Sequence, residues 1–198
     1  MELLSVVGTI AFTVSGYLIG VRKRFDLLGI VILALLTAIG GGIVRDVTLN
    51  HLPRIFLDSR PLWAIFGTLG VAWVVQLHRR SHVWLSRLFI VADSAGLVAF
   101  SLTGAQLALD SGLGLFGVVF IGFMTAVGGG LIRDMLVNDV PFILHKDFYG
   151  SVAILVAAGL FALSRLDAVS HVSIYTLAAL GLTLRLLAHV RDFQLPKA

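Results

Sequence analysis

The chain has 198 residues, of which 58% are hydrophobic and 13% charged, and its mean hydropathy is +0.99. Because about a quarter of the residues of a soluble domain are charged, this composition excludes an ordinary soluble protein and indicates one integral membrane domain, 1–198. The net charge of +4 does not indicate a nucleic-acid partner, because the basic residues lie in short connections without interleaved aromatics. The absence of cysteine excludes disulfides, thiol catalysis and thiolate metal sites.

Seven apolar stretches are expected to form membrane-spanning helices, because about 20 residues cross a hydrocarbon core of about 30 Å. In chain order they are 3–20, 27–46, 61–77, 88–109, 113–134, 148–164 and 170–188. The connection 47–60 is expected to be a short interfacial helix or loop, with 135–147 as its counterpart. The tail 189–198 is expected to be polar and exposed. The sequence therefore predicts an all-α membrane protein.

A ten-residue motif occurs twice with an offset of 88 residues. Thr37-Ala-Ile-Gly-Gly-Gly-Ile-Val-Arg-Asp46 recurs as Thr125-Ala-Val-Gly-Gly-Gly-Leu-Ile-Arg-Asp134. Between 37–53 and 125–141, nine of 17 positions are identical: Thr, Ala, three Gly, Arg, Asp, Asn and Pro. The same offset pairs glycines further upstream, without a gap. Chance similarity of two apolar stretches would not keep the polar residues in register, so we interpret the chain as an internal repeat.

The two repeats, 3–79 and 88–165, each contain three predicted spans. Because three is odd, the second repeat enters the membrane from the opposite side, which gives a 3+3 inverted repeat followed by a seventh helix, 170–188. Eleven of the 15 Lys and Arg residues lie after spans one, three and five or at the end of span seven. The positive-inside rule then places the N-terminus outside and the tail 189–198 in the cytoplasm.

Each repeat contains three successive glycines within a predicted span: Gly40, Gly41, Gly42, Gly128, Gly129 and Gly130. A glycine inside a helix costs roughly 1 kcal/mol relative to alanine, so a triplet marks a weak point where the helix can break. A break beside a water-filled path would present free carbonyls to a cation. The alternative is that the small residues only let two helices pack closely.

Each triplet is followed by an adjacent Arg-Asp pair: Arg45, Asp46, Arg133 and Asp134. A charge at bilayer depth costs at least a few kcal/mol unless it faces protein or water. Neighbouring helical residues point about 100° apart, so each Arg need not pair with the next Asp. Either the pairs sit at span ends and reach interfacial water, or Arg45 pairs with Asp134 and Arg133 with Asp46. Pairs of the second kind could line or gate a path.

Other polar residues also lie within the predicted spans. Asp93 is about one turn inside the fourth span, and its repeat partner is Ser5. It is either a helix-start carboxylate favoured by the helix dipole or a cation site at the inner mouth. The hydroxyl groups either bond the backbone of their own helix or line a pore; they belong to Ser15, Thr37, Ser101, Thr103 and Thr125.

Catalytic and cofactor motifs are weak in this chain. The segment 112–117 matches a GxGxxG pattern, but no strand precedes it and it opens a membrane span, so we reject a dinucleotide site. The six histidines form no HExxH motif, and no Ser/His/Asp set is placed convincingly. We therefore expect neither an enzyme nor a metal site, and no cofactor beyond a permeant ion.

With the doubled Thr-Ala-x-Gly-Gly-Gly-x-x-Arg-Asp motif and the Pro53 and Pro141 that follow it, the sequence resembles the prokaryotic trimeric intracellular cation (TRIC) channel family over about 3–165. The resemblance implies a homotrimer in the lipid of the cell inner membrane, with one pore per protomer. It implies conduction of potassium or another monovalent cation past the glycine-broken second and fifth helices. Two departures are Ser5, where relatives often have an acid, and Gln106-Leu107, where many have a lysine.

Two other functions remain open. Bacterial relatives have also been described as glycine transporters, and broken helices with inverted repeats serve a secondary transporter for a small zwitterion equally well. A membrane scaffold without transport is the third possibility, and the doubled buried charges argue against it.

Overall fold

The computed structural model describes residues 1–145 and 148–191, and this part of the chain contains helices and connections but no strand. The helices are α1 (Glu2–Arg22), α2 (Leu27–Thr48), η1 (Arg54–Phe56), α3 (Arg60–Val74), η2 (Leu77–Arg79), α4 (His82–Asp110), α5 (Leu115–Leu136), α6 (Phe142–His145), α7 (Tyr149–Arg165) and α8 (His171–Val190). The all-α prediction is confirmed. The expected polar tail falls mostly on 192–198, outside the described residues.

Five of the described helices are long and apolar enough to cross a membrane: α1, α2, α4, α5 and α8. Helix α7 is apolar but has only 17 residues, and α3 has 15, which corresponds to about 23 Å at 1.5 Å per residue. Helix α3 ends before the predicted 77 because Gln76 adopts a left-handed conformation with φ of 51°. The connection 47–60 forms the expected short helical turn, η1.

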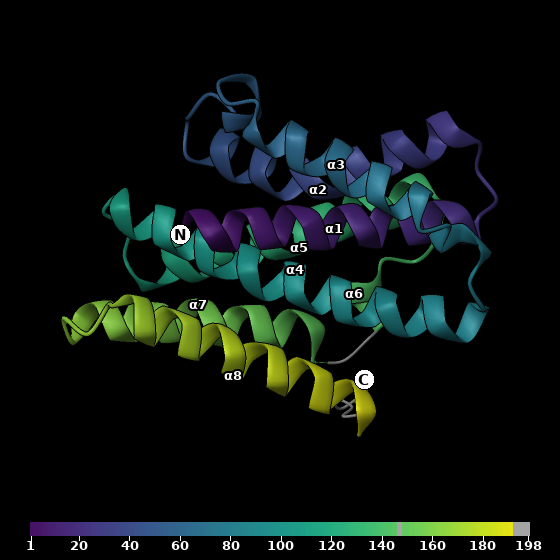
Figure 1. Ribbon diagram of the computed structural model, residues 1–198. Helices are drawn as coiled ribbons and strands as arrows, with labels where there is room; N and C mark the ends of the chain where they lie inside the picture. Colours follow the sequence, from purple (N-terminus) through teal and green to yellow (C-terminus); the bar gives the residue numbers. More distant parts are fainter. Residues whose placement is uncertain (146–147, 192–198) are drawn as a thin grey trace.

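The helices form a bundle with α1, α4 and α5 at its centre (Figure 1). Helices α2 and α3 cover one side, and α7 and α8 cover the other. The N-terminus and the end of α8 lie toward opposite ends of the bundle in this view. The most buried parts of the long helices are in α1 and α4, which agrees with their central position.

Helices α1 and α4 pack through a reciprocal contact between residues that the offset of 88 makes equivalent. The ring of Phe100 lies against Gly8, and the ring of Phe12 lies against Gly96. The two rings meet edge to face with centroids 5.2 Å apart, an arrangement that aromatic pairs favour. A Cβ at either glycine would come within 3.0 Å of the facing ring, so both positions require glycine for close packing.

Ion pairs connect the ends of the helices. Lys23, just after α1, binds Asp139 in the connection after α5, with 2.6 Å between Nζ and Oδ1. At the start of α3, Arg60 binds Asp58 at 2.8 Å and Glu2 of α1 at 3.2 Å. The connections after α1 and α5 therefore share one end of the bundle. The connection before α3 lies beside the N-terminus.

Candidate functional site

Helices α2 and α5 cross at the two glycine triplets, with their backbones in direct contact. A Cβ on Gly41 would overlap the carbonyl oxygen of Thr125, and a Cβ on Gly129 would overlap that of Thr37. A Cβ on Gly128 would lie 3.0 Å from Cα of Gly41. Any larger side chain at this crossing would therefore push one backbone away from the other. The small-residue packing interpretation describes this arrangement well.

The expected breaks at the triplets are not present. Helix α2 runs without interruption through Gly40, Gly41 and Gly42, and α5 through Gly128, Gly129 and Gly130. The prediction of broken second and fifth helices is therefore wrong in this conformation. The physical reason is that contact between the two backbones buries both triplets' faces, and packing outweighs the roughly 1 kcal/mol per glycine that opposes a helix.

The third glycine of each triplet accommodates the arginine one turn later. A Cβ on Gly130 would lie 3.5 Å from Nη2 of Arg133 and 3.4 Å from the hydroxyl oxygen of Tyr149. In the first repeat, a Cβ on Gly42 would lie 3.8 Å from Nη2 of Arg45. Each guanidinium thus folds back along its own helix over a residue without a side chain.

The Arg-Asp pairs bind within themselves rather than across the repeats. Nε of Arg45 donates to Oδ1 of Asp46 at 2.8 Å, and Nε of Arg133 donates to Oδ1 of Asp134 at 2.8 Å. The predicted cross-pairing of Arg45 with Asp134 and of Arg133 with Asp46 is therefore wrong, and so is the alternative that these residues reach interfacial water. All four residues are buried, and Arg133 is fully inaccessible. The backward fold of each guanidinium over a glycine brings Nε to the next residue.

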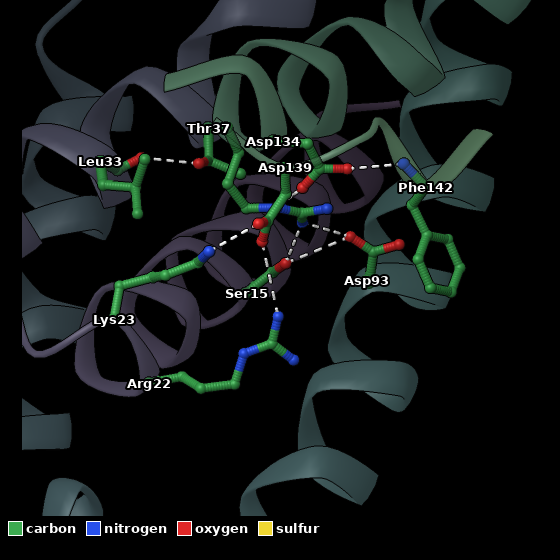
Figure 2. Close-up of polar contacts among 10 residues, drawn as sticks. Ser15, Arg22, Lys23, Leu33, Thr37, Asp93, Asp134, Asp139 and Phe142 are labelled. Carbon is green, nitrogen blue, oxygen red and sulfur yellow. Dashed lines mark hydrogen bonds and ion pairs between the residues drawn. The ribbon is translucent and has the colours of Figure 1, made fainter. Parts of the chain in front are cut away.

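The second carboxylate oxygen of each aspartate fixes the connection that follows. Oδ2 of Asp46 accepts the backbone N–H of Arg54, and Oδ2 of Asp134 accepts that of Phe142, each at 2.8 Å. Figure 2 shows the bond between Asp134 and Phe142. Both aspartates therefore act twice, as a counter-ion for arginine and as an acceptor that holds the next segment.

Asp93 lies at the centre of a buried polar cluster, which we call the Asp93 cluster: Ser15, Asp93, Arg133, Asp134, Tyr149 and Arg185. Oδ1 of Asp93 accepts a 3.1 Å hydrogen bond from Ser15 and a 2.6 Å hydrogen bond from Nη1 of Arg133 (Figure 2). Arg133 also donates to Ser15. The cluster thereby joins α1, α4 and α5 beside the second triplet.

The helix-start interpretation of Asp93 is wrong. Helix α4 begins at His82 rather than at 88, so Asp93 lies about three turns inside the helix and only 2% of it is exposed. It is therefore not a helix-start carboxylate. The place beside its Oδ1, where a cation was expected, holds the guanidinium of Arg133.

The hydroxyl groups divide into two kinds. Thr37 and Thr125 each donate at 2.6 Å to a carbonyl of their own helix, and Thr103 donates to its own helix at 3.3 Å. Ser101 instead donates to the carbonyl of Ala153 on α7. Only Ser15 reaches the Asp93 cluster, so the structure favours the backbone-bonding interpretation for the threonines.

Two further residues of the cluster were missed by the sequence analysis, Tyr149 and Arg185. The guanidinium carbon of Arg185 lies 5.1 Å from the ring centre of Tyr149 and 5.7 Å from that of Phe142. Arg185 is a lone arginine inside an otherwise apolar span, and that position was the signal that could have found it.

A cavity of about 210 Å³ lies at the end of the bundle that holds the C-terminal end of α1. Its wall is mostly apolar, and Arg22, His82 and His189 are among its lining residues. Phe89 and Phe142 also line it, and their ring centres are 6.2 Å apart. The ring of Phe89 is 5.0 Å from the guanidinium carbon of Arg133, so this lining residue also contacts the Asp93 cluster.

Comparison with known proteins identifies relatives of this chain. Residues 2–79 and 90–165 match the family model described as glycine transporter. A UPF0126 membrane protein of Deinococcus radiodurans is 44% identical over 146 residues, covering 72% of this chain and 66% of that protein, just under two thirds of its length. The UPF0126 inner membrane protein YadS of Escherichia coli K12 is 33% identical over 152 residues, covering 77% of this chain and 73% of YadS.

The fold is shared with solved TRIC channels. A prokaryotic TRIC channel crystallised in 0.5 M KCl superimposes with a TM-score of 0.88 at 31% identity, over 98% of both chains. A TRIC orthologue from Rhodobacter sphaeroides gives 0.88 at 30% identity, over 97% of this chain and 98% of that one. A structure solved to explain conductance through TRIC cation channels gives 0.85 at 33% identity, over 100% of this chain and 97% of that one. The chain therefore belongs to the membrane-protein family whose model is described as glycine transporter, and within it to the prokaryotic TRIC channels.

Proposed function

We propose that this protein is a channel for monovalent cations, selective for potassium, with one path in each protomer of a homotrimer. The observation that carries the proposal is the Asp93 cluster, which places a carboxylate deep inside an apolar bundle of TRIC fold, beside the glycine crossing. Ionisable residues at membrane depth are costly and mark ion paths when they face the interior of the bundle. The path runs along the α2–α5 crossing.

The conformation described here corresponds to a closed path. Arg133 occupies the position beside Asp93 that a permeating cation would take, and its guanidinium makes the 2.6 Å contact. Phe89 and Phe142 line the cavity and lie against the guanidinium groups of Arg133 and Arg185. Opening therefore requires Arg133 to leave Asp93 and the α2–α5 contact to loosen, so that backbone carbonyls near the glycines face water.

The topology we propose has seven spans, 3+3 as an inverted repeat plus α8. It is supported by contacts that occur twice, between residues that the offset of 88 makes equivalent. In α1 and α4, Gly8 lies against Phe100 and Gly96 lies against Phe12. In α2 and α5, the glycine triplet of each helix lies against the threonine carbonyl of the other helix. Such reciprocity is what a pseudo-two-fold axis produces. The ion pair of Lys23 with Asp139 agrees with connections one and five on the same side, which we assign to the cytoplasm.

A second candidate function is favoured by the family model, which is described as glycine transporter. A secondary transporter would bind a small zwitterion with the same groups: a carboxylate such as Asp93 for the ammonium end and an arginine for the carboxylate end. The two functions differ in whether the protein conducts without a substrate.

Single-channel recording and radiolabelled glycine uptake, performed on the same reconstituted liposomes, test the proposal. We expect unitary potassium currents in the absence of glycine and no saturable glycine uptake above that of protein-free liposomes. Saturable uptake without unitary currents would replace the channel by the transporter.

A further inference from the structure

Arg185 of α8 is a buried cation that has no carboxylate partner within 1–145 and 148–191. Only 3% of the residue is exposed, and its Nε has no hydrogen-bond partner in the described part of the chain. Among the described residues no carboxylate oxygen lies within 4.0 Å of it, and its guanidinium lies over the faces of two aromatic rings. A buried guanidinium that lacks a counter-ion is destabilising, so its presence requires an explanation.

The Asp93 cluster contains equal numbers of arginines and carboxylates, but one arginine binds both carboxylates. Two arginines, Arg133 and Arg185, face two carboxylates, Asp93 and Asp134. Both carboxylates are bound by Arg133, at 2.6 Å and 2.8 Å. Asp134 is additionally held in place by the backbone N–H of Phe142, whereas Asp93 has no such backbone contact among the described residues. Asp93 is therefore the carboxylate that is free to change partner.

Arg185 lies where it can take over Asp93. Its guanidinium carbon lies 5.1 Å from the ring centre of Tyr149, and the hydroxyl of Tyr149 faces Asp93. Among the described residues the hydroxyl of Tyr149 makes no hydrogen bond of normal geometry, although it faces Asp93, and Nη2 of Arg133 has no partner; both atoms border the space above Gly130. Orphaned buried polar atoms at one place indicate that this packing is not the only one that satisfies the groups.

We propose that Asp93 exchanges its arginine, binding Arg133 in the state described here and Arg185 in a second state. In the second state each arginine has one carboxylate, Arg133 with Asp134 and Arg185 with Asp93. The exchange also breaks the bonds of Arg133 to Asp93 and Ser15, which join α5 to α4 and α1. If the proposed channel function holds, this is the step that opens the path, and Arg185 is a positioning residue that acts through Asp93.

The exchange is tested without conduction by a double-mutant cycle on thermal unfolding of the purified protein in detergent. If either arginine can neutralise Asp93, Arg133→Gln and Arg185→Gln should each be tolerated better than their combination. We expect the double variant to be less stable than the two single losses of stability predict when they are added. The unfolding equilibrium constant should exceed that additive value by about tenfold. Arg165→Gln, at an exposed position, serves as the matched control: combined with Arg133→Gln, it should give an effect equal to the sum of the two single effects. Effects that add to within about twofold would overturn the exchange.

A second cycle uses potassium currents and needs no variant of Arg133. Arg185→Gln should lower the ratio of open to closed time about tenfold, because the second state loses its partner. In the Asp93→Asn background the same change should have no further effect. An equal effect of Arg185→Gln in both backgrounds would contradict action through Asp93. If the wild type carries no current, the channel proposal fails, and the unfolding cycle still decides the exchange.

Discussion

At the scale of single residues, the glycines of one triplet have different functions, although they are identical and adjacent. Gly41 and Gly129 allow two backbones to touch, and a Cβ there would overlap a carbonyl oxygen of the other helix. Gly42 and Gly130 instead lie beneath a guanidinium, which a Cβ would meet only at ordinary van der Waals distance, 3.8 Å and 3.5 Å. Because the sequence repeats the triplet as a unit, only the geometry of the crossing separates these two functions.

Gly41→Ala should therefore destabilise the protein, whereas Gly42→Ala should not. The first adds a methyl group against backbone, which cannot yield without moving a helix, and such overpacking costs about 1–3 kcal/mol. The second meets nothing closer than 3.8 Å and gains up to about 1 kcal/mol of helix propensity. Thermal unfolding of the two variants in detergent measures the difference. Equal midpoints would show that α2 and α5 do not touch at Gly41.

Within the Asp93 cluster, Asp93→Asn should be far more harmful than Ser15→Ala. The asparagine leaves Arg133 with one carboxylate instead of two, and disrupting a buried ion pair costs about 3–5 kcal/mol. The alanine removes a neutral hydroxyl and costs about 1 kcal/mol. The comparison requires the same unfolding assay. A smaller loss for Asp93→Asn than for Ser15→Ala would contradict the assignment of Asp93 as the central counter-ion.

At the scale of elements, the repeated asparagines end α2 and α5. Asn50 and Asn138 have φ of 58° and 56°, the left-handed region. The N–H of each asparagine bonds the carbonyl three residues back, and the next N–H bonds the carbonyl of Asp46 or Asp134. This is the Schellman arrangement, which favours glycine or asparagine at this position. The repeat conserves Asn between its halves because both helices need the same ending.

Asn50→Ala should lower stability by about 1 kcal/mol, because alanine tolerates the left-handed region poorly. Asn50→Gly should be neutral, since glycine adopts that conformation without a steric penalty. The pair separates backbone strain from the loss of a side chain, and thermal unfolding reports it. A glycine variant as unstable as the alanine variant would assign the effect to the amide instead.

The sequence predicts the elements better than the contacts. The predicted spans 27–46 and 113–134 lie within two residues of α2 and α5 at each end. The start of α4 was missed because His82, Ser86 and Arg87 interrupt the apolar stretch, although the helix itself begins at His82. The Arg-Asp pairing was missed because neighbouring side chains on a helix point in different directions, and short side chains at those positions do not touch. The arginine side chain is long enough to fold back over a glycine and reach the next aspartate. Arg185 was missed because it belongs to neither repeat.

At the scale of the whole molecule, sidedness is the feature that most directly follows from charge. The sequence has no cysteine, so single cysteines can be introduced without background. Ser59 and Ser81 are both exposed and lie before α3 and before α4. A cysteine in place of Ser81 should react with an impermeant maleimide only from the cytoplasmic side, and one in place of Ser59 only from outside. The reverse pattern would invert the proposed orientation.

The trimer is also a property of the whole molecule, and native mass spectrometry in mild detergent measures it. We expect a homotrimer, as the relatives named trimeric channels imply. A persistent monomer under conditions that keep the protein folded would count against one path per protomer in a trimer.

The measurement that tests the central claim most directly is the reversal potential of unitary currents through the purified wild-type protein under a tenfold KCl gradient. A path that conducts potassium and excludes chloride predicts reversal at about 59 mV in magnitude, with the sign of a cation. The same recording on Asp93→Asn should change conductance or open probability, because the carboxylate lies on the proposed path. Reversal near zero, reversal with the sign of chloride, or no unitary current while glycine uptake saturates would contradict a cation channel.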